Sequence, residues 1–351
     1  MKSSSFRHFA VMAGIIGLVA LKGTSASAEV PLSQKVQSLR DAAKEEASVS
    51  IFVSTDPRTR SDEEKLEKQI EADLGVKIRV SLVSGAPDPV YIQQLIQQHN
   101  AGVQSPVDIV VTVPPLLNVM KGGGVIAPTD WASLDANPED TNTDIHGLFV
   151  AEFSRPVIYN TNLLKPDEIP KNLDELLSSK WKGRIVTAAL PDIFLPWATG
   201  LGRDATLNMV KTMFNDLKVG VAPAPTAIRT LVESGEYPIG FGIRISTSQI
   251  TNGSPVAYAP IKSPLVPRFA VVTESSSHKN SAMLVAWWLS QTENGQKLSA
   301  EVLDWPRHTT PGTDLFQMAK MTDGFYSAPA SWWTSEGVEI GKAVAQLLRT
   351  F

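Results

Sequence analysis

The sequence has no cysteine among its 351 residues. Disulfide bonds, thiolate metal sites and cysteine nucleophiles are therefore excluded, and the stability of the fold must come from packing. Common catalytic motifs are also missing, since the chain has no G-x-S-x-G and no H-E-x-x-H sequence. No phosphate-binding G-x-G-x-x-G or Walker sequence follows a predicted strand. These absences favour a binding protein over an enzyme.

The first 28 residues have the pattern of an export signal. Lys2 and Arg7 precede an apolar stretch from Phe9 to Leu21, and Ala26-Ser27-Ala28 matches a cleavage site. The apolar stretch has roughly 13 residues, fewer than the about 20 that a membrane span needs, so we expect a cleaved signal peptide rather than a permanent anchor. No cysteine follows the cleavage site, which excludes a lipid-anchored form. A periplasmic location is the expected result.

The remaining chain, residues 29–351, is acidic and long enough for two lobes with separate cores. It keeps 29 of the 32 Lys and Arg residues, because three lie in the signal, and it has 36 Asp and Glu residues, so its formal charge is −7. That sign disfavours nucleic acid as a partner. It does not exclude an anionic ligand, because a few nearby groups set the field inside a cleft.

Strands and helices alternate along the chain, which predicts the α/β class with parallel, helix-covered sheets. After a helix over 32–46, a first unit has expected strands at 49–54, 76–83 and 107–113 and expected helices at 61–74, 89–100 and 114–120. A second unit has expected strands at 184–188, 219–222, 238–243 and 255–259 and expected helices at 204–217, 226–233 and 246–251. A bend at 264–267, a strand at 269–273 and one long helix over 280–303 follow.

Residues 155–185 carry the most specific pattern. Val157 to Thr161 is an apolar strand ending in Tyr-Asn-Thr, and a Pro-rich turn leads to a short Leu-rich helix capped by Asn172. The segment WKGRI, from Trp181 to Ile185, follows this helix. This order of elements resembles the extracellular solute-binding proteins of bacterial ABC importers, a group that includes ferric-iron, phosphonate, thiamine and polyamine binders. Weaker resemblance extends over most of the chain, including GSPVAYAP at 253–260.

The resemblance implies a two-lobed type II periplasmic-binding-protein (Venus flytrap) fold with a ligand cleft between the lobes. In this family the chain crosses between the lobes twice. The expected division is 29–120 plus 262–308 for lobe 1, 121–261 for lobe 2, and 309–351 for a C-terminal helical tail across lobe 2. The implied partners are a small-molecule ligand and a membrane ABC permease with its ATPase. The sequence gives no sign of obligate oligomerisation, so a monomer is expected.

In parallel α/β sheets ligands bind at the carboxyl ends of the strands, and this rule selects the candidate ligand-binding residues. Most carry a hydroxyl or an amide, and ordinary turn or cap chemistry is the alternative for each. Lobe 1 supplies Ser54, Thr55, Ser84, Gly85 and Thr112. Lobe 2 supplies Tyr159, Asn160, Thr161, Thr187, Arg244 and Ser246.

Arg244 is the candidate with the most direct chemical role. It follows the strand expected at 238–243 and precedes Ser246 at a predicted helix start, so we expect its guanidinium to meet an anion beside free N–H groups. A surface or interlobe ion pair is the alternative. Arg155 is a second candidate. These residues favour a small organic anion, a carboxylate or a phosphonate. A polyamine-like cation would need carboxylates at the strand ends, and the candidate residues include none, although three acidic residues lie close to those ends: Asp56, Asp88 and Asp192.

Metal binding and a cofactor are not expected. Ferric binders of the resembling family usually supply an adjacent tyrosine pair after the strand that is here 238–243, where this chain has Ile243-Arg244-Ile245-Ser246. None of its five tyrosines is adjacent to another, and iron prefers phenolate as a hard donor. The histidines show no metal-ligand spacing, which argues against zinc.

The expected function is that of the periplasmic substrate-binding component of an ABC transporter, which captures a small solute and delivers it to the permease. Two other receptor functions stay open: a ferric-iron or polyamine transport receptor, and a periplasmic ligand-sensing subunit. A secreted enzyme on the same scaffold is the third alternative, because catalytic triads are set by geometry and not by their order in the sequence.

Overall fold

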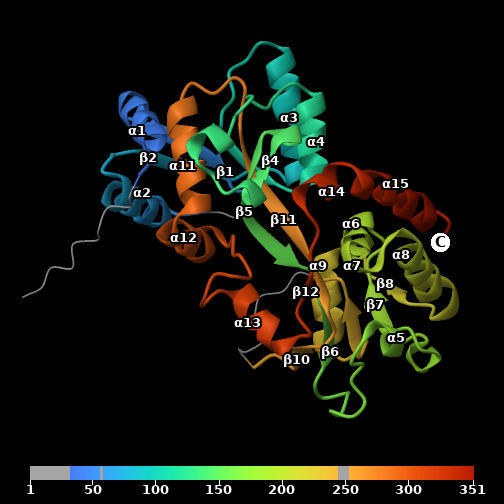
Figure 1. Ribbon diagram of the computed structural model, residues 1–351. Helices are drawn as coiled ribbons and strands as arrows, with labels where there is room; N and C mark the ends of the chain where they lie inside the picture. The colour runs from blue at the N-terminus through green and yellow to red at the C-terminus, as the bar shows by residue number, and fades with distance from the viewer. Residues whose placement is uncertain (1–31, 56–57, 244–252) are drawn as a thin grey trace, which may run out of the picture.

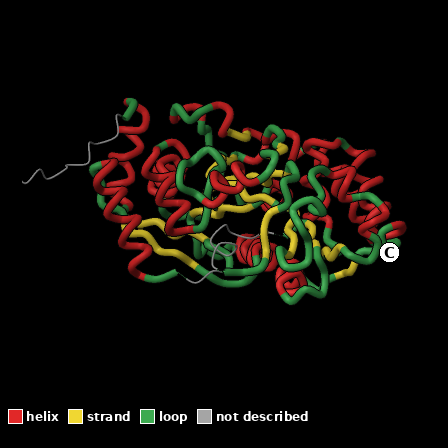
Figure 2. Tube along the Cα trace, turned by 90° about the horizontal axis from the view of Figure 1, so that it is seen from below, coloured by secondary structure: helices red, strands yellow, loops and turns green. Residues whose placement is uncertain are grey.

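In the computed structural model, which describes residues 32–55, 58–243 and 253–351, the chain forms two α/β lobes (Figure 1). Figure 2 shows the strands in the interior with helices around them. The signal peptide predicted at 1–28 and the helix predicted at 246–251 lie outside the described residues. Within the described ranges, no helix is both long and apolar enough to cross a membrane.

A seven-stranded sheet organises lobe 1, in the order β2-β1-β3-β11-β5-β4, with β12 paired to β11. Strands β1, β2 and β3 are parallel, and β11 runs antiparallel to both β3 and β5. The carboxyl ends of β1, β2, β3 and β5 therefore lie at one edge of the sheet. The strand bounds are β1 Ser48–Phe52, β2 Arg79–Val83, β3 Ile109–Thr112, β4 Thr141–Asn142, β5 Gly147–Ser154, β11 Ser263–Val272 and β12 Phe325–Tyr326.

Helices cover both faces of this sheet. One face packs against α1 (Gln34–Glu46), α2 (Arg60–Leu74), α11 (Lys279–Gln291) and α12 (Glu293–Leu303), and the other against α3 (Asp88–Asn100) and α4 (Pro114–Gly122). Short 3-10 turns complete the lobe: η1 Ala132–Leu134, η2 Pro138–Asp140 and η3 Thr143–Ile145. Helix α2 begins with a capping box between Thr59 and Asp62, so it starts one residue before the helix expected at 61–74.

Two predicted features of this region are wrong. The single helix expected over 280–303 is broken at Thr292, which has extended backbone angles and accepts the Gly295 N–H at 3.0 Å. This cap begins α12 as a separate helix. The bend expected at 264–267 is part of β11, because pairing with β5 and β12 overrides the local effect of its two prolines.

A five-stranded sheet organises lobe 2, in the order β10-β6-β9-β7-β8. Strands β7, β8 and β9 are parallel, whereas β6 runs antiparallel to β9 and β10. The strand bounds are β6 Val157–Asn160, β7 Ile185–Thr187, β8 Gly220–Val221, β9 Ile239–Phe241 and β10 Val256–Tyr258. The helical segments are α5 Leu173–Leu176, η4 Ser179–Trp181, α6 Pro191–Phe194, η5 Leu195–Trp197, α7 Ala198–Leu201, α8 Arg203–Lys211, the π-helix η6 Thr212–Asp216 and α9 Pro225–Glu233.

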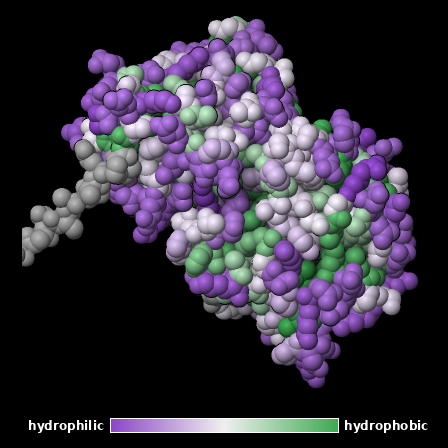
Figure 3. Space-filling model, viewed as in Figure 1, coloured by the Kyte–Doolittle hydropathy of each residue, from purple (hydrophilic) through white to green (hydrophobic). Residues whose placement is uncertain are grey.

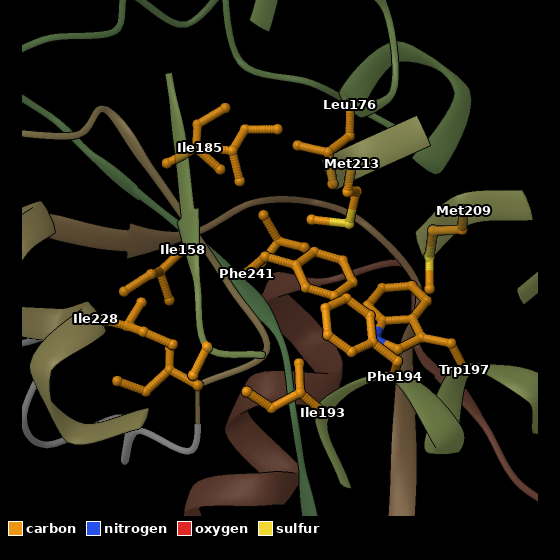
Figure 4. Packing of buried hydrophobic residues seen from close by; sticks show 14 of the residues in the cluster. Ile158, Leu176, Ile185, Ile193, Phe194, Trp197, Met209, Met213, Ile228 and Phe241 are labelled. Carbon is orange, nitrogen blue, oxygen red and sulfur yellow. The ribbon is translucent and has the colours of Figure 1, made fainter. Parts of the chain in front are cut away.

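Aromatic stacking fills the centre of lobe 2 (Figure 4). The ring of Phe241, on β9, lies 5.7 Å from that of Phe194 and 5.0 Å from that of Trp197. All three side chains are fully buried, and they belong to a hydrophobic cluster that is separate from those of lobe 1.

The chain crosses between the two sheets at residues 155–156 and again at 259–262. The expected division placed all of 121–261 in lobe 2, but β4 and β5 pair within the sheet of lobe 1. No strand was expected at 147–154, because β5 is buried on both faces and shows no polar alternation.

The C-terminal tail spans both lobes. Its helices are α13 (Asp314–Met321), α14 (Ala330–Thr334) and α15 (Glu336–Leu348), with β12 between the first two. Helix α14 contacts α4 of lobe 1, and α15 packs on α6 and α8 of lobe 2. The tail therefore ties the lobes together on one side, which limits the direction in which they can rotate.

Candidate functional site

The crossing segments bring strand ends of both lobes to one place. Arg155 follows the carboxyl end of β5 and leads directly into β6. Because β6 is antiparallel to β9, the start of β6 lies beside the end of β9, and the Gly242 N–H donates to the Pro156 carbonyl at 3.1 Å. Figure 3 shows the two lobes as separate masses that meet across a narrower middle. We call this region the lobe junction and define it by Phe153, Arg155, Asp192, Gly242 and Arg268.

Four predicted residues of lobe 1 come together at the edge facing the junction. Ser54 and Thr55 form the turn after β1, and Ser84 and Gly85 follow β2. The Gly85 N–H donates to the Ser54 carbonyl at 2.8 Å, which joins the two turns. Ser54 adopts φ +63°, a left-handed conformation that is uncommon outside glycine and frequent at functional sites.

The Thr112 side chain lies inside lobe 1 and already forms a hydrogen bond. Its side chain is fully buried, and its hydroxyl donates to the Asp88 carboxylate at 2.8 Å in the first turn of α3. In lobe 2, Thr187 is buried as well, and its hydroxyl donates to the Phe241 carbonyl at 3.1 Å. Both hydroxyls thus hold neighbouring elements in place.

The structure separates Tyr159, Asn160 and Thr161 from the other candidates. The rule that selected them applies to parallel strands, but β6 runs antiparallel, so its carboxyl end lies at the edge of the sheet opposite to the junction. Asn160 is buried there and donates to the Val232 carbonyl at 2.6 Å. These three residues therefore lie at the edge of the sheet opposite to Thr187, which ends β7. Arg244 and Ser246 lie outside the described residues, and their role stays a prediction.

Arg155 is the most strongly positioned cation of the lobe junction. Its Nη2 atom forms an ion pair with the Asp192 carboxylate, and its Nη1 atom donates to the Gly242 carbonyl at 3.4 Å. Its Cζ atom lies 5.4 Å from the centroid of the Phe153 ring. The Arg155 side chain is 11% exposed and that of Asp192 is 59% exposed. The guanidinium is thus held in one orientation while its carboxylate partner stays accessible to solvent.

Arg268 is a second cation of the junction, and it was missed in the sequence. It lies on β11, where Phe269 pairs with Thr112, so Arg268 stands one residue beyond the carboxyl end of β3. Its Cζ atom lies 5.6 Å from the centroid of the Phe153 ring. One feature of the sequence could have identified it, because Arg268 is the single cation in the segment SPLVPRFAVV. This segment was expected to contain a bend at 264–267, so it was not recognised as one strand.

Tyr91, Tyr159 and Tyr326 have different surroundings. Tyr91 is stacked on Phe52, with ring centroids 3.8 Å apart, and burial raises its pKa to about 12. Its hydroxyl has no hydrogen-bond partner among the described residues. Tyr159 lies on the far edge of its sheet, and Tyr326 packs edge-on against Trp197 at 6.5 Å. In the described part of the chain, no group of three or more His, Asp or Glu side chains is arranged to hold a metal ion.

A pH-dependent contact lies next to the junction. His308 Nδ1 is 2.5 Å from Glu152 Oε1, and this hydrogen bond raises the pKa of His308 although burial opposes the rise. Because the folded pKa exceeds the unfolded value, the pair stabilises the fold below about pH 6.5 and loses this contribution as pH rises through the folded pKa. Glu152 belongs to β5, so the contact anchors the start of the tail to a crossing strand.

We expect the His308→Gln variant to lose more stability at about pH 5.5 than at about pH 8.5, because only protonated His308 forms the charged pair. Urea unfolding of both proteins at the two pH values measures this difference. The Glu152→Gln variant serves as a control and is expected to remove the same pH dependence. An equal loss at both pH values would show that the pair is not charged.

Known proteins resemble this chain in sequence and in structure, although no family model matches it. It is 30% identical over 148 residues to the Fe(3+)-binding periplasmic protein of Serratia marcescens, a match that covers 40% of this chain and 42% of the relative. The iron-bound HitA structure from Pseudomonas aeruginosa has a TM-score of 0.59 and 17% identity, and covers 85% of this chain and 99% of its own.

Two further solved structures are similar over most of their length. IdiA (FutA) of Trichodesmium, in complex with iron and citrate ligands, has a TM-score of 0.65 and 15% identity, and covers 86% of this chain and 99% of its own. An ABC transporter substrate-binding protein from Bradyrhizobium japonicum has a TM-score of 0.64 and 13% identity, with the same coverage. The predicted fold class is confirmed. The chain therefore has the two-lobed type II fold of the periplasmic substrate-binding proteins of ABC transporters, which it resembles.

Proposed function

We propose that this protein is the periplasmic substrate-binding component of an ABC transporter, and that it captures a small organic anion between its lobes. The fold and the names of the similar proteins support a transport receptor over an enzyme. In this function the ligand binds one lobe first, favours closure through its contacts with the other, and is then released to a membrane permease. A monomer with one cleft is sufficient for these steps.

The observation that carries the anion proposal is the position of Arg155. It stands where the chain crosses between the lobes, at the carboxyl end of β5 and beside the carboxyl end of β9. Its contacts with Gly242 and Phe153 orient the guanidinium before any ligand arrives. A carboxylate or phosphonate that replaces Asp192 there gains charge-assisted hydrogen bonds without ordering the arginine.

Ferric binding is the second candidate function, because the Serratia and Pseudomonas proteins are described as binding iron. The arrangement of tyrosines argues against coordination of iron by a phenolate pair. Two of the five, Tyr91 and Tyr258, are buried, and the ring of Tyr91 stacks on that of Phe52. A phenol whose pKa is raised is also a weaker source of phenolate. We therefore favour the organic anion.

We expect Arg155→Gln to weaken binding of small carboxylates or methylphosphonate by about 10-fold to 100-fold, because one charged hydrogen-bonding group of the site is lost. A thermal-shift screen followed by isothermal titration calorimetry measures the effect. Arg244 follows Ile243 at the end of the predicted strand, so Arg244→Ala is also expected to weaken binding of the same anions. Each variant is first compared with the wild type by its melting temperature without ligand.

The matched control is Arg184→Gln, which removes the same charge from lobe 2. Arg184 is exposed and precedes β7, so it lies at the edge opposite to the junction. Its variant is expected to bind as the wild type does. Equal affinities of the Arg155 and Arg184 variants would remove Arg155 from the site. Stabilisation by ferric citrate or spermidine, with none by the anions, would favour the alternative receptors.

A further inference from the structure

His308 is bound to the strand that leads into the first crossing between the lobes. Its Nδ1 atom lies 2.5 Å from Glu152 Oε1, and its backbone N–H donates to the same oxygen at 2.8 Å. The Glu152 N–H donates to the Pro306 carbonyl at 2.9 Å. Glu152 belongs to β5, which ends just before the crossing at 155–156. The start of the tail is therefore attached to this strand by one contact that needs the imidazole and by two that do not.

The same imidazole contacts a strand beside the second crossing and begins a third connection. Its ring packs edge-on against that of Phe325 on β12, with ring centroids 5.8 Å apart. Phe325 pairs with Ser263, the residue that follows the crossing at 259–262. Beyond His308, residues 309–313 lead to α13, which packs in the hydrophobic cluster of lobe 2. A change at this one side chain therefore acts on three segments that join the lobes.

Negative charge dominates the surroundings of the His308 ring. The charged side chains on the described elements packed around it are three carboxylates and two cations: Glu152 of β5, Glu139 and Asp140 of η2, Arg307 of the tail, and Lys262 beside β12. Arg307 and Asp140 form an ion pair of 3.3 Å, and Lys262 lies over the Tyr326 ring, 5.0 Å from its centroid. The hydrogen bond to Glu152 raises the pKa of His308, while burial opposes the rise. The protonated ring is therefore the form that this environment favours.

The imidazole also has room to leave Glu152 once it is neutral. Its side chain is 41% exposed, whereas that of Glu152 is 7% exposed. A cavity of about 210 Å³ adjoins the ring, and its wall includes Pro267, Phe269 and the tail segment 327–330. A neutral imidazole loses the charge that strengthens its bond to the carboxylate, so it holds the strand less firmly.

We propose that His308 is a pH-dependent switch of the hinge between the lobes. When protonated, it holds β5, β12 and the start of the tail in the arrangement of this structure. When neutral, it releases them, and the lobes rotate over a wider range. The receptor is therefore stiffer at acidic pH than at alkaline pH. This switch depends on the two-lobed fold and not on the class of ligand, so it stands or falls separately from the proposed anion.

The test measures the distance between spin labels on the two lobes by double electron–electron resonance. Because the chain has no cysteine, Lys77→Cys in lobe 1 and Asp204→Cys in lobe 2 give two defined labels, at side chains that are 84% and 94% exposed. Without ligand, the share of distances outside the main peak is expected to rise by about twofold or more from about pH 5.5 to about pH 8.5. This comparison leaves His308 in place, so it does not depend on the folding of a hinge variant.

Two substitutions in the labelled protein assign the effect to His308. His308→Gln is expected to give the broader distribution at both pH values, because glutamine has no charged form. The matched control is His278→Gln, which removes a histidine 3.3 Å from Asp108, at the edge of the lobe 1 sheet opposite to the crossings. It is expected to keep the pH difference of the wild type. Equal distributions at both pH values in the wild type, or a difference that survives in His308→Gln, would overturn the proposal.

Discussion

Replacing Asp73 with leucine is expected to lower the free energy of unfolding by about 4 kcal/mol, because one fully buried donor and two half-buried donors lose a carboxylate partner. Asp73 is fully buried on α2. It accepts from Trp288 Nε1 at 2.8 Å, from Gln69 Nε2 at 2.8 Å and from Asn294 Nδ2 at 2.9 Å. These bonds join α2 to α11 and α12, so the loss affects the packing of the whole helical face of lobe 1. Urea unfolding measures it.

Two companion variants separate the causes. Asp73→Asn keeps the shape and one carbonyl acceptor, so it is expected to lose less stability than the leucine variant. Asp135→Asn, at a side chain that is 51% exposed in the same lobe, is expected to change the free energy of unfolding by less than about 0.5 kcal/mol. A leucine variant as stable as the wild type would mean that Asp73 makes no net contribution.

Substituting alanine for Gly242 is expected to lower the free energy of unfolding by about 3 kcal/mol and to weaken anion binding as well. Gly242 has φ +78°, a conformation that strains any L side chain. A Cβ atom there would also lie 2.2 Å from the Cγ2 atom of Ile193, which is fully buried in the core of lobe 2. Since the Gly242 carbonyl accepts from Arg155, any shift of this backbone moves the guanidinium. Chemical denaturation and calorimetry measure the two effects.

The chain offers a matched control for the clash. Gly183 has a similar φ of +71°, but nothing lies within 4 Å of a Cβ atom added there. Gly183→Ala is therefore expected to lose only about 1 kcal/mol from backbone strain. The clash is tested further in the background of Ile193→Ala, where Gly242→Ala is expected to be less harmful because the obstructing methyl group is absent. An unchanged loss in that background would leave backbone strain as the sole cause.

The C-terminal tail and the crossing strand β5 are joined at adjacent residues of that strand. Glu152 and Phe153 are neighbours on β5, with Glu152 joined to His308 of the tail and Phe153 lying under the two guanidinium groups. A closing movement of the lobes that shifts β5 therefore affects both the contact of Glu152 with His308 and the contacts of Phe153 with the two arginines. We expect ligand binding to be sensitive to substitutions at β5 for this reason.

The sequence alone determined most of the local structure. Apolar periodicity and caps located β1, α2, α3 and the segment from β6 to α5, because these signals depend on neighbouring residues only. The likeness of residues 155–185 to solute-binding proteins was sufficient to predict the two-lobed fold, which the structural comparisons confirm. The sequence also located the turns that contain Ser54, Thr55, Ser84 and Gly85 after parallel strands, while their role in binding stays a prediction.

Only the tertiary structure decided which residues share the junction. The antiparallel direction of β6 moves Asn160 to the far edge, and the register of β11 with β5 brings Arg268 within reach of the Phe153 ring that Arg155 also contacts. Strand direction and register arise from hydrogen bonds between segments about a hundred residues apart in sequence, and no local pattern encodes them. The physical reason is that a side chain's neighbours across a sheet are set by its pairing partner, whereas its own sequence sets only its face.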